Sequence, residues 1–238
     1  MVLATHVGFL EATLIHLLQP LDPKSIIQTH SELKQIIAKE GPFDGIIGYS
    51  GGAALAAELI IEQDPFALDP LFRFAVFING AWPLRVFKLA DVELSDETFD
   101  PTIALEQARN MFLRPSALRH KDGVSEEDQA DHEKLLGLLE KLEGKMLKDE
   151  TAFLSDGEYG MTRWESKAPL IDIPTVHIRS TAEDEKDPHH GLHLVGLCNA
   201  EEAIEIHHEF GHDFPRGRLL MNKIADAIRE VAEASRGL

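Results

Sequence analysis

The chain has 238 residues, a length that suits one α/β domain, and 44% of them are apolar, which argues against global disorder. Its formal net charge of −18 argues against a nucleic-acid or anionic-membrane surface, because phosphate groups would be repelled. The only cysteine, Cys198, cannot form an intramolecular disulfide, which is typical of a reducing compartment. We therefore expect a cytoplasmic protein that binds neither nucleic acid nor membrane.

The N-terminal segment is predicted to form a helix over residues 3–18. Its apolar residues recur at alternating spacings of four and three and form one stripe: Leu3, Val7, Leu10, Leu14 and Leu17. The segment lacks the basic region and the cleavage site of a secretory signal, and it stops at Pro20, too early for a membrane span. The stripe either folds back on the chain's own sheet or forms a homodimer through residues 3–18.

The next elements indicate a sheet with helices. A helix over about 23–40 ends at Gly41-Pro42, and "FDGIIGY" (43–49) follows as a short buried strand. A helix then runs from Ser50 to about residue 63, and "LFRFAVFING" (71–80) is a second strand.

Residues 81–168 interrupt this pattern. The stretches 101–113 and 125–150 are predicted to be helical, so the segment is either a helical lid over a site or an enlarged crossover. Further elements follow it: a strand at 173–180, a short helix at 192–198, a strand at 203–209 and a last helix at 216–235. The alternation predicts a single α/β domain over 1–238, with a parallel sheet flanked by helices and 81–168 inserted in it.

Gly48-Tyr49-Ser50-Gly51-Gly52 has the pattern Gly-x-Ser-x-Gly between a predicted strand and a predicted helix. On such a turn the serine backbone is strained, and side chains two residues before and after would collide, so glycine is needed there. The turn exposes the hydroxyl and places the N–H of Gly51 at a helix N-terminus, where it can bind a developing oxyanion. Ser50 is therefore a candidate nucleophile; the alternative, a phosphate-binding loop, lacks the lysine of a P-loop.

A nucleophilic serine needs a base, and chain order selects His212 from the twelve histidines. It lies in "FGHDFP", in the loop between the last strand and the last helix, whereas His207 and His208 are predicted to be a strand pair with one side chain inside and one outside. The acid is expected in "TAEDEKDP" after residue 180, which offers Glu183, Asp184, and two further carboxylates, and the pattern does not single one out. No cofactor and no metal is predicted.

Three stretches resemble the fungal family-of-serine-hydrolases (FSH-type) α/β-hydrolases: "GPFDGIIGYSGGAALAAEL", "IPTVHIRSTAEDE" and "HHEFGHDFP". The resemblance implies an α/β-hydrolase-like fold, with Ser50 as nucleophile and His212 as base. The family's aspartate lands on Glu183 without a gap, while residue type favours Asp184, one residue on. Family members usually begin with a strand and an L-H-G loop that supplies a second oxyanion N–H. Here only 49 residues precede the serine and no L-H-G is near the start.

The family implies an esterase or thioesterase acting on a small ester or a polyketide thioester, in fungal secondary metabolism, with a polyketide synthase carrier domain as a partner. Two alternatives stay open. The same pocket could run a non-hydrolytic cyclisation, dehydration or isomerisation with His212 as general base, or the chain could be a non-catalytic partner protein that kept the fold.

Overall fold

The computed structural model describes residues 2–6, 8–12, 23–63, 70–102, 105, 137, 141–181 and 191–235, with the backbone alone for 2–12. The chain divides into two compact units. The first consists of Met1–Ile15, Glu32–Leu84 and Arg163–Leu238, and the second of His16–Ser31 and Arg85–Thr162.

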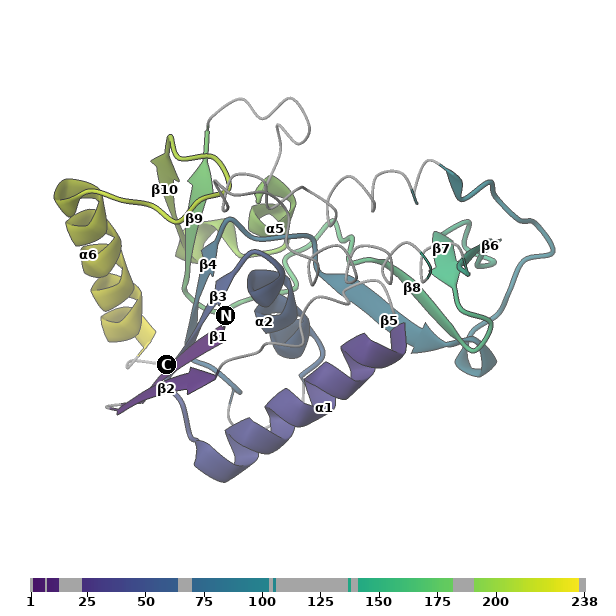
Figure 1. The fold of residues 1–238 in the computed structure, drawn as a ribbon, viewed down its shortest axis with the longest axis horizontal. Helices are drawn as coiled ribbons and strands as arrows, with labels where there is room; N and C mark the ends of the chain where they lie inside the picture. The colour runs from purple at the N-terminus through teal and green to yellow at the C-terminus, as the bar shows by residue number, and fades with distance from the viewer. Residues whose placement is uncertain are drawn as a thin grey trace. The chain divides into compact units, whose positions relative to one another are not determined.

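The first unit is built on a six-stranded sheet whose order is β10-β9-β4-β3-β1-β2 (Figure 1). Four neighbouring strands are mutually parallel: β10 (Ala203–His208), β9 (Thr175–Ser180), β4 (Phe74–Ile78) and β3 (Gly45–Tyr49). All five residues of β4 are buried, as expected for a central strand of a parallel sheet that is covered on both faces.

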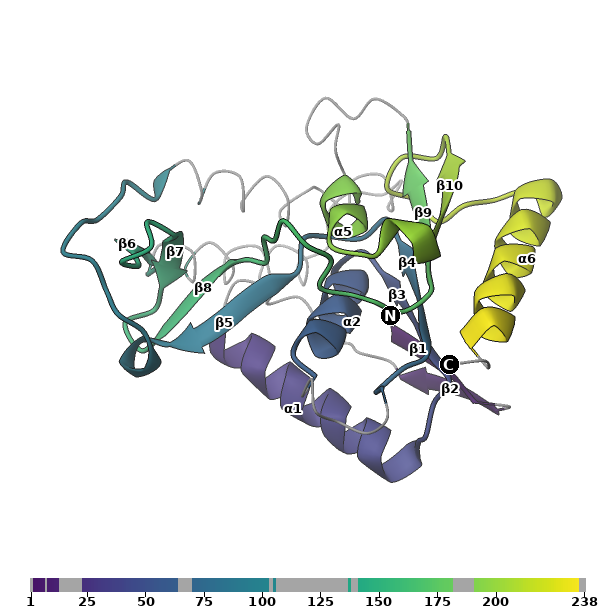
Figure 2. The ribbon, with the colours of Figure 1, turned by 180° about the vertical axis from the view of Figure 1, so that it is seen from behind.

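Helices cover both faces of this sheet, and Figure 2 shows α2 and α6 on opposite sides of it. The short side chains of α2 (Gly51–Ile61) pack with Phe77 of β4 and with Leu194 of α5 (Leu192–Gly196). On the other face, α6 (Arg218–Ala234) packs against Val76. The alternation of Val76 and Phe77 follows from the period of two along a strand, which sends neighbouring side chains to opposite faces.

The elements between residues 23 and 80 and between 173 and 235 confirm the predicted order. The helix predicted over 23–40 is α1 (Pro23–Glu40), and the predicted strands and helices around it begin and end within three residues of the observed ones. His207 is exposed and His208 is buried, as the predicted strand pair requires. Two short 3-10 turns complete the described helices, Leu89–Asp91 and Ala200–Glu202, and no described helix is both long and apolar enough to cross a membrane.

The helix predicted over residues 3–18 is wrong where the structure describes that segment. Residues Val2–His6 form β1 and Gly8–Ala12 form β2, with β1 antiparallel to both β2 and β3. The physical reason is the open edge of β3, whose N–H and C=O groups a strand can pair and a helix cannot. Residues 13–18 lie outside the described part, and the homodimer through 3–18 loses the amphipathic helix on which it was based.

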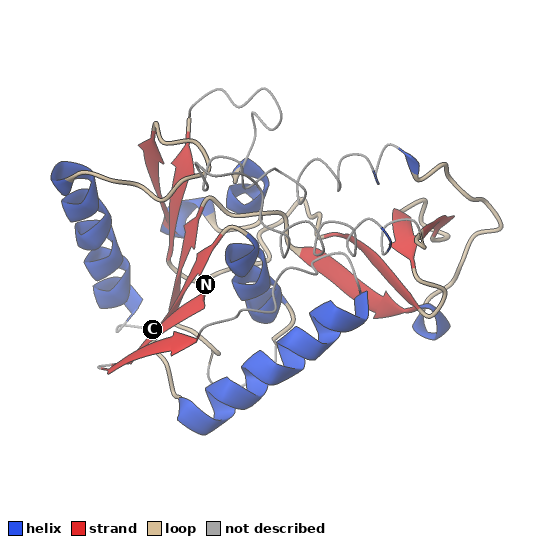
Figure 3. Cartoon of the chain, in the orientation of Figure 1, coloured by secondary structure: helices blue, strands red, loops and turns tan. Residues whose placement is uncertain are grey.

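The second unit contains a four-stranded sheet of order β5-β8-β7-β6, drawn red with the other strands in Figure 3. Its strands are β5 (Leu84–Lys88), β6 (Glu143–Met146), β7 (Ala152–Ser155) and β8 (Tyr159–Arg163). Phe87 and Phe153 make an edge-to-face contact in its core, with ring centroids 5.1 Å apart.

The helix predicted over 125–150 is wrong for the described residues 141–150, which contain β6, whereas residue 137 is helical as predicted. Residues 143–146 pair with β7 instead, because pairing with a partner strand outweighs weak local propensity. Gly144 fits this strand closely, since a Cβ there would lie 2.4 Å from the carbonyl oxygen of Phe99. Most of the stretch 101–113 lies outside the described residues.

Candidate active site

Ser50 occupies a strained turn between β3 and α2. Its backbone angles are φ 53° and ψ −123°, a conformation that a residue with a side chain adopts at a cost of about 1–3 kcal/mol. Hydrogen bonds from neighbouring elements hold it: its N–H donates to the carbonyl of Ile78 (2.9 Å), and its own carbonyl accepts from the N–H groups of Ala53 (3.0 Å) and Ala81 (3.1 Å). The turn is therefore fixed from β4 and α2 together.

Glycine at position 48 is a steric requirement of this turn. A Cβ on Gly48 would lie 2.5 Å from both the Cα of Ala53 and the carbonyl oxygen of Gly52, closer than real side chains come. The strand can therefore approach the start of α2 only because the side chain is absent. Beside Gly51, in contrast, no atom lies within 4 Å of an added Cβ, which leaves open space next to the serine. Gly48 thus has the steric role that the sequence predicts for it.

His212 lies next to Ser50 although 162 residues separate them in the chain. Its Nε2 atom is 2.9 Å from the Oγ atom of Ser50, within the range expected for a serine and its base. It belongs to the β10–α6 loop (residues 209–217), which turns at Gly211, where φ is 61°. With a neutral imidazole whose Nε2 carries no proton, the serine hydroxyl donates to Nε2, the arrangement from which a proton can be transferred as Oγ attacks.

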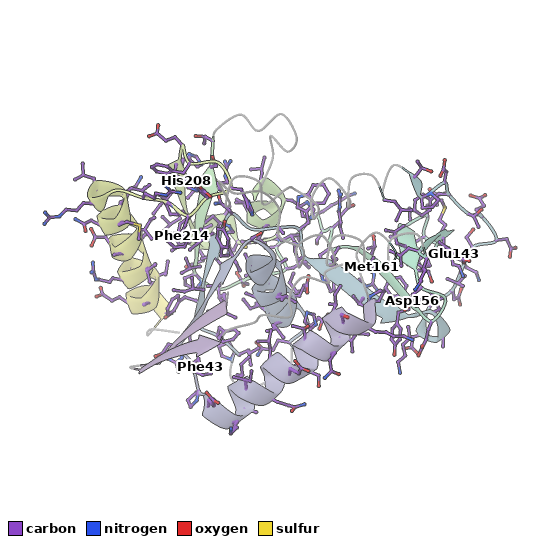
Figure 4. All side chains as sticks on the ribbon, in the orientation of Figure 1. Phe43, Glu143, Asp156, Met161, His208 and Phe214 are labelled. Atoms are coloured by element: carbon purple, nitrogen blue, oxygen red, sulfur yellow. The ribbon has the colours of Figure 1, made fainter. Side chains whose placement is uncertain are left out.

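Tyr49, the last residue of β3 and the neighbour of Ser50, contacts His212 as well. Its hydroxyl donates to the backbone carbonyl of His212, and the two rings lie 5.5 Å apart between centroids. A second ring, that of Phe214, lies 6.0 Å from Tyr49, and Figure 4 labels it near the parallel strands. These contacts hold the β10–α6 loop in place beside the end of β3.

The carboxylates expected to orient His212 fall outside the described residues. Glu183 and Asp184 both belong to the segment 182–190, which follows β9 directly. The loop position itself, after the strand that neighbours β10, agrees with the observed strand order. The Gly51 N–H, expected as an oxyanion donor, begins α2 as predicted. Among the described residues, no group of three or more His, Cys, Asp or Glu side chains is placed to hold a metal ion.

A protein-family model described as "Serine hydrolase (FSH1)" matches residues 20–224, which is most of the chain. The chain belongs to the FSH1 serine hydrolase family. Its fold is accordingly α/β-hydrolase-like, with a parallel sheet between helices, and its class is that of serine hydrolases and esterases.

Two curated relatives that match most of the chain come from fungi. The hydrolase FUB4 of Fusarium oxysporum f. sp. lycopersici is 28% identical over 220 residues, covering 87% of this chain and 73% of the relative. The esterase alnB of Emericella nidulans is 25% identical over 209 residues, covering 82% and 68%. Among solved structures, the monoacylglycerol lipase of Paleococcus ferrophilus aligns with a TM-score of 0.45 and 13% identity, covering 88% of this FSH1 member and 76% of the lipase.

Sequence reasoning missed two residues at the site of this FSH1 hydrolase, Tyr49 and Asn79. Both contact backbone carbonyls of the β10–α6 loop, at sequence separations of 163 and 134 residues. Tyr49 is the variable residue inside the serine motif, so its position beside Ser50 was visible, but its partner was not. Asn79 stands before Gly80 at the end of a strand, a place where turn residues are ordinary.

Proposed function

We propose that this chain hydrolyses a small carboxylic ester or thioester through an acyl-enzyme on Ser50. His212 is the general base that takes the hydroxyl proton, and the N–H of Gly51 binds the oxyanion. Asp184 or Glu183 orients the imidazole and stabilises its cation, the role that an acid has in such a triad. The single observation that supports this most is the 2.9 Å contact between His212 Nε2 and Ser50 Oγ, on a strained strand-to-helix turn.

The steps follow from this arrangement. Ser50 Oγ attacks the carbonyl carbon as its proton passes to Nε2 of His212, and the carbonyl oxygen becomes an oxyanion next to the helix N-terminus. The intermediate collapses and expels an alkoxide or a thiolate, which takes the proton from the imidazolium. Water then attacks the acyl-enzyme with His212 again as base, releases the acid and restores the serine.

The substrate class within this proposal is a polyketide ester or thioester of fungal secondary metabolism, presented by a polyketide synthase carrier domain. The motif resemblance supports it, and so do the fungal relatives named hydrolase and esterase. The pairing of Ser50 with His212 favours hydrolysis over the cyclase alternative, because a general base that acts alone needs no serine at 2.9 Å.

The test is the hydrolysis of p-nitrophenyl butyrate and of the thioester S-butyryl-N-acetylcysteamine by wild type and Ser50→Ala. We expect kcat/KM to fall by at least about 10³-fold in Ser50→Ala, together with loss of labelling by a fluorophosphonate probe. Ser166→Ala, which removes a hydroxyl from an exposed loop, is the matched control and should keep both activity and labelling. Equal rates in wild type and Ser50→Ala would overturn the proposal.

Two further measurements separate the alternatives. In ¹⁸O-labelled water a hydrolase places the label in the acid product, whereas a cyclase or isomerase places none there. The acid is identified by comparing Asp184→Asn with Glu183→Gln, since the variant of the true acid loses about 10⁴-fold in kcat. Similar small effects in both would place the acid elsewhere in the chain.

A further inference from the structure

Asn79 is a fully buried polar residue directly after β4, with 0% of its surface exposed. Its φ angle is 45°, in the left-handed region that asparagine tolerates better than most residues with a side chain. A buried amide has lost its hydrogen bonds to water, so hydrogen bonds within the protein must satisfy it. They reach three other segments of the first unit, which makes it a junction.

The polarity of these bonds is fixed by backbone groups. The N–H of Ser180 can only donate, so the amide atom 3.3 Å from it is the oxygen Oδ1. The carbonyl of Asp213 can only accept, so the atom 3.0 Å from it is the nitrogen Nδ2. The orientation of the Asn79 amide is therefore determined by its surroundings.

His208 completes the chain of bonds. Its Nε2 lies 3.1 Å from Oδ1 of Asn79, which accepts, so Nε2 carries the proton. Its Nδ1 accepts from the N–H of Phe210 at 3.2 Å, so the ring is neutral. Burial, and in second place the charge of His207, lower the pKa of His208, which favours that neutral form. In Figure 4 the residue is labelled near the end of β10.

The two ends of this network attach to the β10–α6 loop on either side of His212. Phe210 lies two residues before the histidine and Asp213 one residue after it, and both are tied through Asn79 to the ends of β4 and β9. The loop has left-handed backbone at Gly211 and an exposed outer side, so local structure alone does not fix it. The bonds on both sides restrict how far the segment that carries the imidazole can rotate or move away from the strand ends.

We propose that Asn79 is a positioning residue for the base: with His208 it clamps the β10–α6 loop at residues 210 and 213 and so holds Nε2 of His212 at Ser50. It does not touch the reacting atoms. This inference rests on the proposed function for its kinetic consequence, while the clamp itself is a property of the loop. Since a displacement of about 1 Å can cost about 10²-fold in rate, loss of the clamp lowers kcat.

Two substitutions separate the clamp from general stability. Asn79→Asp, studied at pH 8, keeps the acceptor for Ser180 and His208 but replaces the donor to Asp213 by an oxygen. Asn79→Gly tolerates the left-handed backbone and removes the whole amide. Thr175→Val is the matched control: Thr175 is equally buried, begins β9 at the other end of the same sheet, and bonds His177 rather than the loop.

We expect kcat on p-nitrophenyl butyrate to fall 10–100-fold in both Asn79 variants, with KM within threefold of wild type. Amide hydrogen exchange in peptides covering residues 209–214 should rise in both, and Thr175→Val should change neither readout. A folded Asn79→Asp with wild-type kcat and wild-type exchange would overturn the clamp. So would loss of folded protein in both variants, which would make Asn79 a residue of global stability.

The two proposals fail in different ways. If wild type and Ser50→Ala hydrolyse p-nitrophenyl butyrate equally, the proposed function fails. Amide hydrogen exchange in residues 209–214 then still decides whether the clamp exists. If hydrolysis depends on Ser50 but neither kcat nor exchange responds to Asn79→Asp, the function stands and the clamp is wrong.

Discussion

Gly48 offers the sharpest test of the turn that presents Ser50. A Cβ added there would lie 2.5 Å from the Cα of Ala53, while carbon atoms in ordinary contact are about 3.5 Å apart, so β3 and the start of α2 must separate by about 1 Å. Overpacking of this kind costs about 1–3 kcal/mol, and a displacement of about 1 Å at a nucleophile costs about 10²-fold in rate. We expect Gly48→Ala to lower both the free energy of unfolding and the rate of hydrolysis by these amounts.

The sign of this effect is informative, because Gly→Ala ordinarily stabilises a protein by about 0.4–1 kcal/mol where the backbone conformation is compatible. Gly196, the last residue of α5, has no atom within 4 Å of an added Cβ, so Gly196→Ala is the matched control and should be neutral or stabilising. The assays are urea unfolding and hydrolysis of p-nitrophenyl butyrate. A Gly48→Ala variant with wild-type stability and rate would refute the close approach of β3 to α2.

Two further predictions concern stability. Burial lowers the pKa of His177 in the folded protein to about 4, from 6.5 in the unfolded chain. Between these two pH values the unfolded chain binds a proton that the folded protein does not. The free energy of unfolding present above pH 6.5 therefore falls as the pH is lowered, by up to about 3 kcal/mol. Urea unfolding at pH 7.5 and 4.5 should show a smaller pH dependence in His177→Gln, and an equal dependence in both proteins would contradict the assignment. Phe77→Ala should lower the free energy of unfolding by about 3–5 kcal/mol, because Phe77 is only 1% exposed. Leu219 is 87% exposed, so Leu219→Ala should change that free energy by no more than about 0.5 kcal/mol. Similar midpoints of the two variants in a thermal melt would contradict the place of Phe77 in the core.

The parts of the site that the sequence predicts are those set by local chemistry. Gly48 and the small residues after Ser50 indicate a tight strand-to-helix turn, because sterics at that turn are decided within a few residues. His212 could be selected since its loop lies between a strand and a helix whose patterns are both clear. Neither inference needs knowledge of distant contacts.

The parts that the sequence does not predict depend on partners far along the chain. The strands at 2–12 form where β3 leaves an edge unpaired, and the apolar spacing of the segment fits a helix as well. The strand at 143–146 exists because β7 pairs with it. Asn79 gives no local signal, since an asparagine before a glycine is ordinary at a strand end and its role lies in bonds to residues 180, 208 and 213.

The strand order explains why the β10–α6 loop needs such bonds. Three spacings of about 4.8 Å separate β10 from β3, so His212 must return about 14 Å across the sheet to reach the serine. Four residues after His208 cover that distance only when nearly extended, yet the loop turns at Gly211. Side chains at the strand ends that the loop crosses hold it in place by hydrogen bonds: Asn79 after β4 and Tyr49 at the end of β3. The proposed base, in the loop after β10, is thus positioned by the ends of the strands between β10 and Ser50.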